Sequence, residues 1–524
     1  MAEAAVTTHV ERRFRRVPAL YLLSGIVALA LLLPETFLVV QASQAGWTEV
    51  RSVLFRPLSA ELLRNTVELT ALVAVATAVI GTAAAWCVVR TSLPLRRLWG
   101  VLVVLPIAIP DFIMGYAWHS LKPGFIGLPA AALVMTLDLY PLIYLPVAAA
   151  LRRTDPALEE SARALGLGSW AVFRRVIFPQ VRSGLIGGML VVSLALLAEF
   201  GAFEIVDFQT FTTEIFAELN VDQSAAAALA LLLVALGIVV LLCEVISSGS
   251  RRVSRSGPQA PRPPVRAALG PWTAPALLGL ALLVTLALGV PVGTLVYWLT
   301  QSHTTTLPAS TTLLGAAGAT ARYSISAAVV ATAAAVPVAL LAGQRRGRLA
   351  RAIESSTFLI QSVPGVVIAL SLVFFAVRYA FPLYQQSSLL VIAYALLFFP
   401  LALVSVRASA MQASPRLAEM GRSLGCRPAV VFLRVTLPLI LPGVAAALCL
   451  VFLSSVTELT ATLILVPTDV QTLATQFWAY QTNTAYGAAA PYAVAILLLA
   501  AVPNLAVVAW FARRRNPAGA VIAT

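Results

Sequence analysis

The sequence predicts an all-α polytopic membrane protein with about twelve transmembrane helices, built as two parallel-repeated units of six helices. Three observations lead to this fold class. Hydrophobic residues make up 60% of the 524 positions and charged residues only 11%, whereas about 25% of the residues in a soluble domain are charged. The basic residues gather on one side of the expected spans, and the two halves of the chain match each other in register.

A membrane helix needs about 20 mostly apolar residues, and about twelve runs in the chain meet that requirement. The first run follows the stretch ERRFRRV. It is about 25 residues long, too long for the roughly 7–15 apolar residues of a signal peptide, so we expect it to be retained. The runs lie at 17–41, 66–89, 98–119, 129–151, 183–207, 224–247, 273–298, 324–343, 357–381, 388–407, 443–466 and 491–512.

The basic residues predict the orientation, because Lys and Arg favour the cytoplasmic ends of spans. With the N-terminus inside, 30 of the 36 basic residues fall on the cytoplasmic side. We therefore expect both termini to be cytoplasmic. This bias accounts for the net charge of +14 without nucleic acid, and no basic cluster has the interleaved aromatic residues of a nucleic-acid surface. The six basic residues expected on the outer side are Arg51, Arg56, Arg64, Lys122, Arg322 and Arg378.

An internal repeat relates the two halves. EESARALGLGSWAVFRRVIFP at 159–179 matches AEMGRSLGCRPAVVFLRVTLP at 418–438 at a constant offset, which also pairs Glu199 with Glu458. A shared register over about 60 residues indicates duplication. Six spans per half make the repeat parallel, and such an axis usually carries a pathway between the halves. The same register pairs Tyr140 with Phe399 and Pro141 with Pro400, and an offset larger by three pairs 210–216 with 472–478.

The stretch at 248–272 is rich in Pro, Arg, Ser and Gly and reads as a cytoplasmic linker between the units. The expected organisation is a first unit at 1–247 with a loop at 152–182, a second unit at 273–515 with a loop at 409–442, and a cytoplasmic tail at 516–524.

Each of these loops predicts a short helix, a glycine turn and a second short helix on the cytoplasmic side. Asp155 followed by proline is a typical helix start, and Gly166 and Gly425 stand where a left-handed stop is expected. Pro179 and Pro438 are expected to end the second helix before the next span.

The first helix of the loop is partly apolar and partly charged. Leu158, Ala162 and Leu165 share one face, while Glu160 lies three residues from Arg163 and can pair with it. Such an element fits a groove on a partner protein, although it could also lie on the lipid headgroups. Two copies kept in register favour docking to a partner.

The pattern E-x-A-x-x-x-G followed by V-x-F-P, and E-x-G-x-x-x-G with V-x-L-P in the second half, resembles the EAA loop of binding-protein-dependent ABC importer permeases. The resemblance covers nearly the whole chain, as two fused six-span permease units. It implies that each loop forms a coupling helix that docks into an ATP-binding subunit. Ser161 and Met420 depart from the usual alanine. The residues carried over are Glu160, Ala162, Gly166 and Pro179, then Glu419, Gly421, Gly425 and Pro438.

The resemblance also implies partners, location and cargo. Two ATP-binding cassette subunits would bind on the cytoplasmic side of the bacterial inner membrane, an extracytoplasmic solute-binding protein would deliver the solute, and transport would proceed by alternating access. Fused permeases of this family are typical of ferric-iron, thiamine and some phosphonate importers. The stretches at 199–216 and 457–478 look most similar to the ferric-iron branch.

The chain shows no sign of being an enzyme. Its one lysine, Lys122, precedes a proline, so there is no Gly-Lys-[Ser/Thr] of a Walker A loop and ATP with Mg would be bound by partner subunits. HExxH and Gly-x-Ser-x-Gly are also absent. The four cysteines and three histidines are too scattered to predict a metal site or another cofactor.

Acidic residues within membrane spans are costly and are candidates for function. Asp111 follows Pro110, and Pro364 lies near the matching place in the second half, so both positions predict a broken helix that lines the pathway or an ordinary kink. The six acidic candidates are Asp111, Asp138, Glu199, Glu204, Glu244 and Glu458.

Glu199 and Glu458 stand out because they are repeat-equivalent. They could face each other across the pseudo-two-fold axis and line a pathway for a cationic or metal substrate. Alternatively, each could accept structural hydrogen bonds. In an ion-coupled secondary transporter, the alternative function class, they would form a proton relay.

Glu214, Glu218 and Asp222 form an acidic cluster on the outer side, with no basic residue nearby in the sequence. The cluster could contact the solute-binding protein or belong to a solvated loop.

Overall fold

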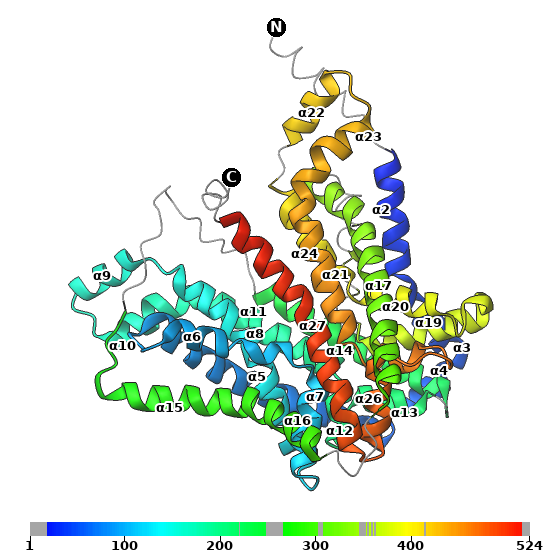
Figure 1. Cartoon of the computed structure of the whole chain (residues 1–524), viewed down its shortest axis with the longest axis horizontal. Helices are drawn as coiled ribbons and strands as arrows, with labels where there is room; N and C mark the ends of the chain where they lie inside the picture. Colours follow the sequence, from blue (N-terminus) through cyan, green and yellow to red (C-terminus); the bar gives the residue numbers. More distant parts are fainter. Residues whose placement is uncertain are drawn as a thin grey trace.

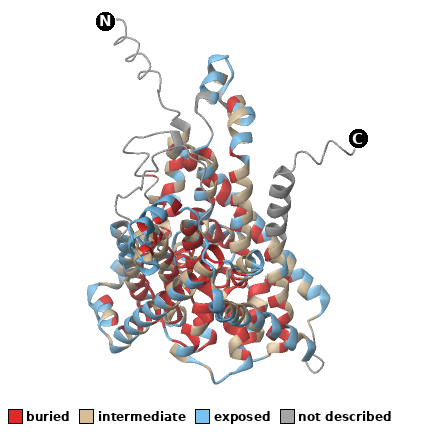
Figure 2. Ribbon diagram, turned by 90° about the vertical axis from the view of Figure 1, so that its left-hand side faces the viewer, coloured by how far each residue is buried: buried red, intermediate tan, exposed pale blue. Residues whose placement is uncertain are grey.

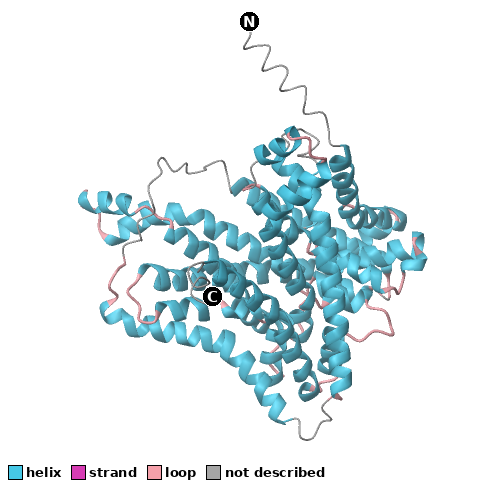
Figure 3. Cartoon of the chain, turned by 45° about the horizontal axis from the view of Figure 1, so that its top comes forward, coloured by secondary structure: helices cyan, strands magenta, loops and turns pink. Residues whose placement is uncertain are grey.

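The computed structural model describes residues 18–219, 221–247, 266–301, 308–344, 353, 356–357, 360, 363–412 and 415–515. Their regular structure is helical, apart from one isolated bridge between Thr91 and Ala267 (Figures 1 and 3). Most of the predicted linker and the whole predicted tail lie outside these residues. The all-α prediction is confirmed for the described part of the chain.

The described helices occur in the same order in both halves. The first half contains α2 (Pro18–Leu31), α3 (Leu33–Ala45), α4 (Trp47–Leu54), α5 (Pro57–Arg90), α6 (Arg96–Leu102), η1 (Leu105–Ala108), α7 (Asp111–Leu121), α8 (Gly127–Arg152), α9 (Pro156–Ala164), α10 (Ser169–Val172), η2 (Phe173–Ile177), α11 (Phe178–Ala198), α12 (Gly201–Ile205), α13 (Phe211–Glu218) and α14 (Gln223–Ser247).

The second half contains η3 (Gly270–Trp272), α15 (Thr273–Val284), η4 (Thr285–Gly289), α16 (Val290–Gln301), α17 (Ser310–Gln344), α19 (Gly365–Tyr379), η6 (Phe381–Leu383), α20 (Ser387–Leu397), α21 (Phe399–Ala410), α22 (Pro415–Ser423), α23 (Pro428–Val431), η7 (Phe432–Thr436), α24 (Leu437–Val456), α25 (Thr460–Leu465), α26 (Leu473–Thr482) and α27 (Tyr486–Arg515).

Local geometry repeats along with the order of the helices. A capping box opens α13, where Thr210 and Thr213 exchange hydrogen bonds, and another opens α26 with Thr472 and Thr475. Both boxes occur at the offset that the sequence predicts. Each box satisfies backbone N–H groups that a helix start leaves free. The same capping motif therefore begins the equivalent helix in both copies of the repeat.

Eight helices among the described residues are long and apolar enough to cross a membrane, or up to ten if each of two bent pairs counts as one span. The bends are 91° between 96–108 and 111–121, and 53° between 387–397 and 399–410. Two more apolar helices, 365–379 and 486–501, are shorter. Each of the twelve predicted runs therefore coincides with an apolar helix or a bent pair, although only eight pass as straight spans.

The first span of each half packs against the other half. In Figure 1, α2 lies beside α17, and α3 packs on α19 as well as on α14. Phe37 of α3 makes edge contacts with Phe375 and Tyr379, with ring centroids 6.0 and 5.5 Å apart. In the same way, Ala287 of η4 is buried in the core that α5, α8 and α11 build, and α16 packs on α7 and α27.

Small residues bring the spans close together. A Cβ on Gly184 of α11 would lie 3.0 Å from the carbonyl oxygen of Pro146, and one on Gly443 of α24 would lie 2.6 Å from that of Ser405. The two glycines are repeat-equivalent, and so are the two carbonyls. Close backbone approach of this kind is how helices pack in lipid. Buried residues accordingly gather in the centre of the molecule (Figure 2).

Candidate functional site

A cavity of about 360 Å³ lies between the two halves of the chain. Both halves line it with residues in matching places: α7 begins at Asp111 and α19 at Gly365, each directly after a proline. The cavity therefore lies on the axis that relates the repeats. Asp138 and Leu397, and Glu199 and Glu458, are pairs at the repeat offset, while Asp111 and Gly365 match as the first residues of α7 and α19.

Glu199 and Glu458 both line this cavity, and both occupy helix breaks. The Oε1 of Glu199 accepts a hydrogen bond of 2.6 Å from the N–H of Ala202, and that of Glu458 accepts one of 2.9 Å from Ala461. Each carboxylate thus caps the short helix that follows, α12 or α25. The two interpretations of these residues coexist, because each glutamate lines the cavity and also accepts a structural hydrogen bond.

The predicted spans 183–207 and 443–466 are wrong at both ends. The helices run over 169–198 and 429–456 and stop before the glutamates. Apolar residues continue past each break, so hydropathy alone does not detect it. The carboxylate replaces the backbone acceptors that a continuous helix would supply, and this stabilises the break.

Asp111 and Asp138 add two carboxylates from the first half. The Asp111 carboxyl lies within hydrogen-bonding reach of that of Glu199, and it interacts electrostatically with Asp138 and Glu458. Pro110 also lines the cavity and stands at the 91° break before α7. Pro364 occupies the matching position before Gly365, which reaches the wall in its place. Both positions are helix starts rather than mild kinks.

Contacts across the two halves surround the cavity. A Cβ on Gly201 would lie 2.7 Å from Cδ2 of Leu459 and 2.9 Å from Cβ of Phe112, so the glycine allows a close approach here. The ring of Phe112 lies 5.2 Å from that of Phe477. The hydroxyl of Tyr116 donates a hydrogen bond of 2.7 Å to the carbonyl of Tyr486. The first half and the second half therefore meet tightly next to the carboxylates.

The two cytoplasmic loops form the predicted helix and glycine turn. Gly166 and Gly425 have φ values of +81° and +82°. The N–H of Leu167 donates to the carbonyl of Ala162 at 3.1 Å, and the N–H of Cys426 donates to Gly421 at 3.2 Å. This six-residue closure is the Schellman stop, so the predicted left-handed helix stop at both glycines is confirmed.

The loop helices present apolar side chains to the outside. Leu165 is 82% exposed and its equivalent Leu424 is 81% exposed. Ala162, predicted on the same face as Leu165, is buried instead. In Figure 1, α9 and α10 lie at the left edge of the molecule, while α22 and α23 lie at its top. Each half thus exposes its own apolar loop helix.

Pro179 and Pro438 do not end the second loop helix, and that prediction is wrong. The helical path continues from α10 through η2 into α11, and from α23 through η7 into α24. Both η2 and η7 are π-helical turns that directly precede the proline-containing start of the span. A wider turn of this kind accommodates the missing N–H of proline without breaking the helix.

Glu159, which the sequence gave no reason to choose, anchors the first loop. Its carboxylate forms a buried ion pair with Arg90 at the end of α5, and Arg90 also donates to the hydroxyl of Thr154 at 3.1 Å. Glu160, the residue of the sequence motif, is exposed, and the structure shows no ion pair between it and Arg163 among the described residues. The second loop has Ala418 where the first has Glu159.

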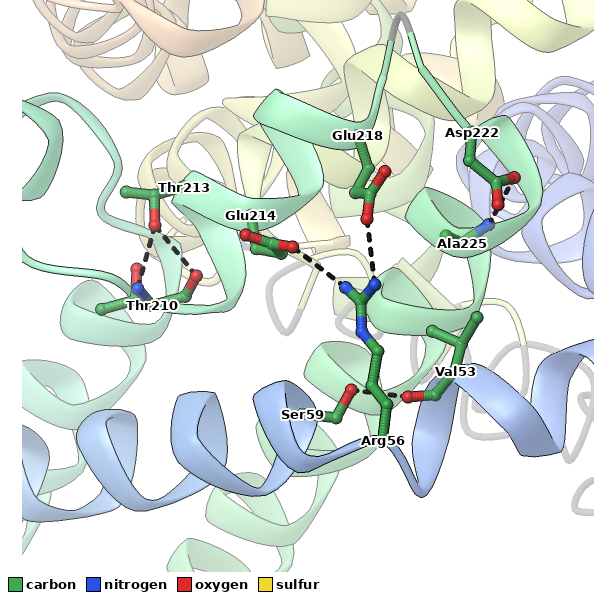
Figure 4. Close-up of polar contacts among 9 residues, drawn as sticks. All are labelled: Val53, Arg56, Ser59, Thr210, Thr213, Glu214, Glu218, Asp222 and Ala225. Atoms are coloured by element: carbon green, nitrogen blue, oxygen red, sulfur yellow. Dashed lines mark hydrogen bonds and ion pairs between the residues drawn. The ribbon is translucent and has the colours of Figure 1, made fainter.

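The outer acidic cluster, which has no basic residue nearby in the sequence, has a basic partner that is distant in the chain. Arg56 pairs with Glu214 at 3.0 Å and with Glu218 at 3.1 Å (Figure 4). Asp222 accepts hydrogen bonds from the backbone at the start of α14, including one of 3.1 Å from Ala225. More than 150 residues separate Arg56 from its partners, which is why the sequence did not reveal them. The three acidic side chains are engaged within the chain.

Known proteins resemble this chain along nearly its full length or along one part of it. It is 37% identical over 502 residues to the Fe(3+)-transport system permease protein FbpB 2 of Haemophilus influenzae. The alignment covers 93% of this chain and 98% of that protein. The sulfate transport system permease protein CysT of Salmonella typhimurium is 30% identical over 237 residues, 41% of this chain and 86% of its own length. The molybdenum transport system permease protein ModB of Escherichia coli is 29% identical over 203 residues, 33% of this chain and 84% of its own length.

A family model matches the chain twice, over residues 77–252 and 335–516. Each match contains one loop helix, one capping glutamate and one capping box. Members of such a family are transport permeases and not themselves enzymes. The chain therefore belongs to the family described as binding-protein-dependent transport system inner membrane component, the permeases of ABC importers, and it carries two copies of the family unit.

Proposed function

We propose that this chain is the transmembrane permease of an ATP-driven, binding-protein-dependent importer of ferric iron. One observation carries the proposal: the relative that matches from end to end, at 37% identity, is a permease of Fe(3+) transport. The relatives of sulfate and molybdenum transport match less than half of the chain.

The charge on the cavity wall supports a cationic cargo. Four carboxylates line the cavity, and no basic residue is among the described residues that line it. An anion such as sulfate, molybdate or a phosphonate would find no basic partner among these residues. Thiamine remains the cationic alternative among the substrates of fused permeases.

Two ATP-binding cassette subunits would dock on the two loop helices. Leu165 and Leu424 give each half one exposed apolar anchor at the same place in the motif, and a groove on a partner is the usual receptor for such a helix. ATP and Mg would be bound by these partners. Closure of the ATPase pair would bring the two loops together and rock the halves about their common axis.

The topology in this proposal has twelve spans, with the bent pairs and the two shorter helices each crossing once. Both termini are cytoplasmic, and the units extend over 1–247 and 273–515. An extracytoplasmic solute-binding protein would approach the opposite face, where α13 and α26 lie. Glu214, Glu218 and Asp222 would shape that face through their contacts within the chain, rather than hold the binding protein.

The test is reconstitution of the permease in proteoliposomes with its ATPase subunits and solute-binding protein. We expect uptake of radioactive ferric ion that needs ATP, and no uptake of sulfate, molybdate or thiamine. Uptake driven by a proton gradient without the ATPase would instead show an ion-coupled secondary transporter. Transport of another solute in place of iron would overturn the cargo and leave the transporter class standing.

A further inference from the structure

We propose that Asp111, Asp138 and Glu199 of the first half, completed by Glu458 of the second, form a one-sided transit site for a multivalent metal cation. The inference rests on the proposed function, because it places the cargo in the cavity between the halves. It goes further in naming Asp138 as a selective residue and in assigning the ion to one half of a duplicated chain.

The cavity is symmetric in shape but not in charge. The first half contributes Asp111 and Asp138; in the second half Gly365 is the matching helix start and Leu397 stands at the repeat offset of Asp138. Only the Glu199 and Glu458 pair is kept in both halves. A cation in this cavity is therefore attracted to the wall that α7, α8 and the end of α11 build, while the other wall offers one carboxylate, Glu458, beside Ser454, Thr457 and Thr460.

Asp138 is the side chain that points to a ligand. It is 8% exposed, it lines the cavity, and no hydrogen bond or ion pair holds it among the described residues. Glu199 and Glu458 each have one oxygen engaged by a helix start, and Asp111 has one oxygen engaged by the N–H of Phe112 at 2.9 Å. A buried carboxylate without any partner is costly, and a mobile cation in the cavity would supply the missing countercharge.

The geometry favours transit over tight storage. Among the described residues, no group of three or more His, Cys, Asp or Glu side chains is arranged to hold a metal ion. Asp111 and Glu199 lie within hydrogen-bonding reach of each other, and all four carboxyl groups line one space of about 360 Å³. A pathway needs such binding, favourable enough for the ion to enter and weak enough for it to leave.

The test uses the full complex in proteoliposomes, with Asp138→Asn as the main variant and Asp138→Glu as the charge-preserving variant. We expect Asp138→Asn to lower ferric-ion uptake about tenfold, while ATPase stimulation by the loaded binding protein persists. Asp138→Glu should recover most of the uptake. Glu204→Gln is the matched control, since Glu204 is acidic, belongs to the neighbouring α12 and does not line the cavity; its uptake should stay within about twofold of wild type.

A second measurement separates this inference from the proposed function. Terbium(III), a luminescent trivalent ion, is titrated into the purified full-length chain, with gallium(III) as competitor. We expect weak binding that Asp138→Asn reduces about tenfold and Glu204→Gln leaves unchanged. If wild type binds terbium through Asp138 but does not transport iron, the iron assignment fails and the cation site stands. Wild type without terbium binding, or Asp138→Asn with unchanged binding or uptake, overturns the site.

Discussion

Arg90 at the last position of α5 and Glu159 in α9 form a buried ion pair that ties a membrane span to a loop helix. Their side chains are 4% and 2% exposed. The guanidinium also lies over the ring of Trp86, 5.6 Å from its centroid. The linker reaches the same place, because the N–H of Ala267 donates to the carbonyl of Arg90 at 2.9 Å. The first loop is thus fixed to its span by a contact that the second loop, with Ala418, lacks.

Removing Arg90 should destabilise the chain strongly. Arg90→Met leaves the Glu159 carboxylate buried and unpaired, a change that costs about 3–5 kcal/mol. The double variant Arg90→Met with Glu159→Gln should lose much less than the sum of the single changes. Thermal unfolding of the purified protein measures this. The control is Arg163→Met on the exposed side of α9, expected within about 0.5 kcal/mol of wild type. Additive losses would show that the pair is not coupled.

Valine at Gly166 and Gly425 should prevent assembly with the ATPase. Both glycines have positive φ, and a β-branched residue there costs about 1–3 kcal/mol, so the loop helix would lose its stop and its exposed leucine would turn away. Co-purification of the ATPase subunits is the measurement. Gly168→Ala is a suitable control, because Gly168 has φ −67° and open space around its Cα. A double valine variant that still forms the complex and transports would refute the docking proposal.

Gly443→Ala should destabilise the chain, because the new methyl group meets the carbonyl of Ser405 at 2.6 Å in the backbone contact between α21 and α24. Overpacking of this kind costs about 1–3 kcal/mol. Gly187→Ala adds the same methyl group to α11, where nothing lies within 4 Å, and should leave the melting temperature unchanged or slightly raised. Equal melting temperatures for both variants would contradict the close packing.

Arg56→Gln should have a small effect compared with Arg90→Met. The Arg56 side chain is 27% exposed and its partners Glu214 and Glu218 are 16% exposed, so solvent screens the pairs and we expect a loss of about 1 kcal/mol or less. Thermal unfolding in low and high salt checks this, since the loss should shrink as salt rises. A loss as large as that of Arg90→Met would mean that burial does not govern these pairs.

The sequence could predict those features that depend on local patterns or on the duplication itself. The glycine stops at Gly166 and Gly425, the repeat register and the apolar runs all follow from nearby residues, and the structure reproduces them. Features that depend on distant partners were out of reach: nothing near Arg90 in the chain indicates Glu159, which lies 69 residues away.

The helix breaks at Glu199 and Glu458 were missed for a different reason. Hydropathy sums apolar character over a window, and the residues after each break remain apolar, so the runs look continuous. What ends each helix is one carboxylate that caps the next one. The sequence does show an acidic residue at the equivalent place in each half. This residue indicates a helix break only when its ability to cap a helix is considered together with the cost of burying it.

The exchange of first spans means that neither half of the sequence packs as a separate body. The helices α2 and α3 pack on α17 and α19 of the second half, and α16 packs on α7 of the first, so each half holds a helix of the other. Cutting the chain within 248–265 should not let the halves drift apart, because each would still hold a helix of the other.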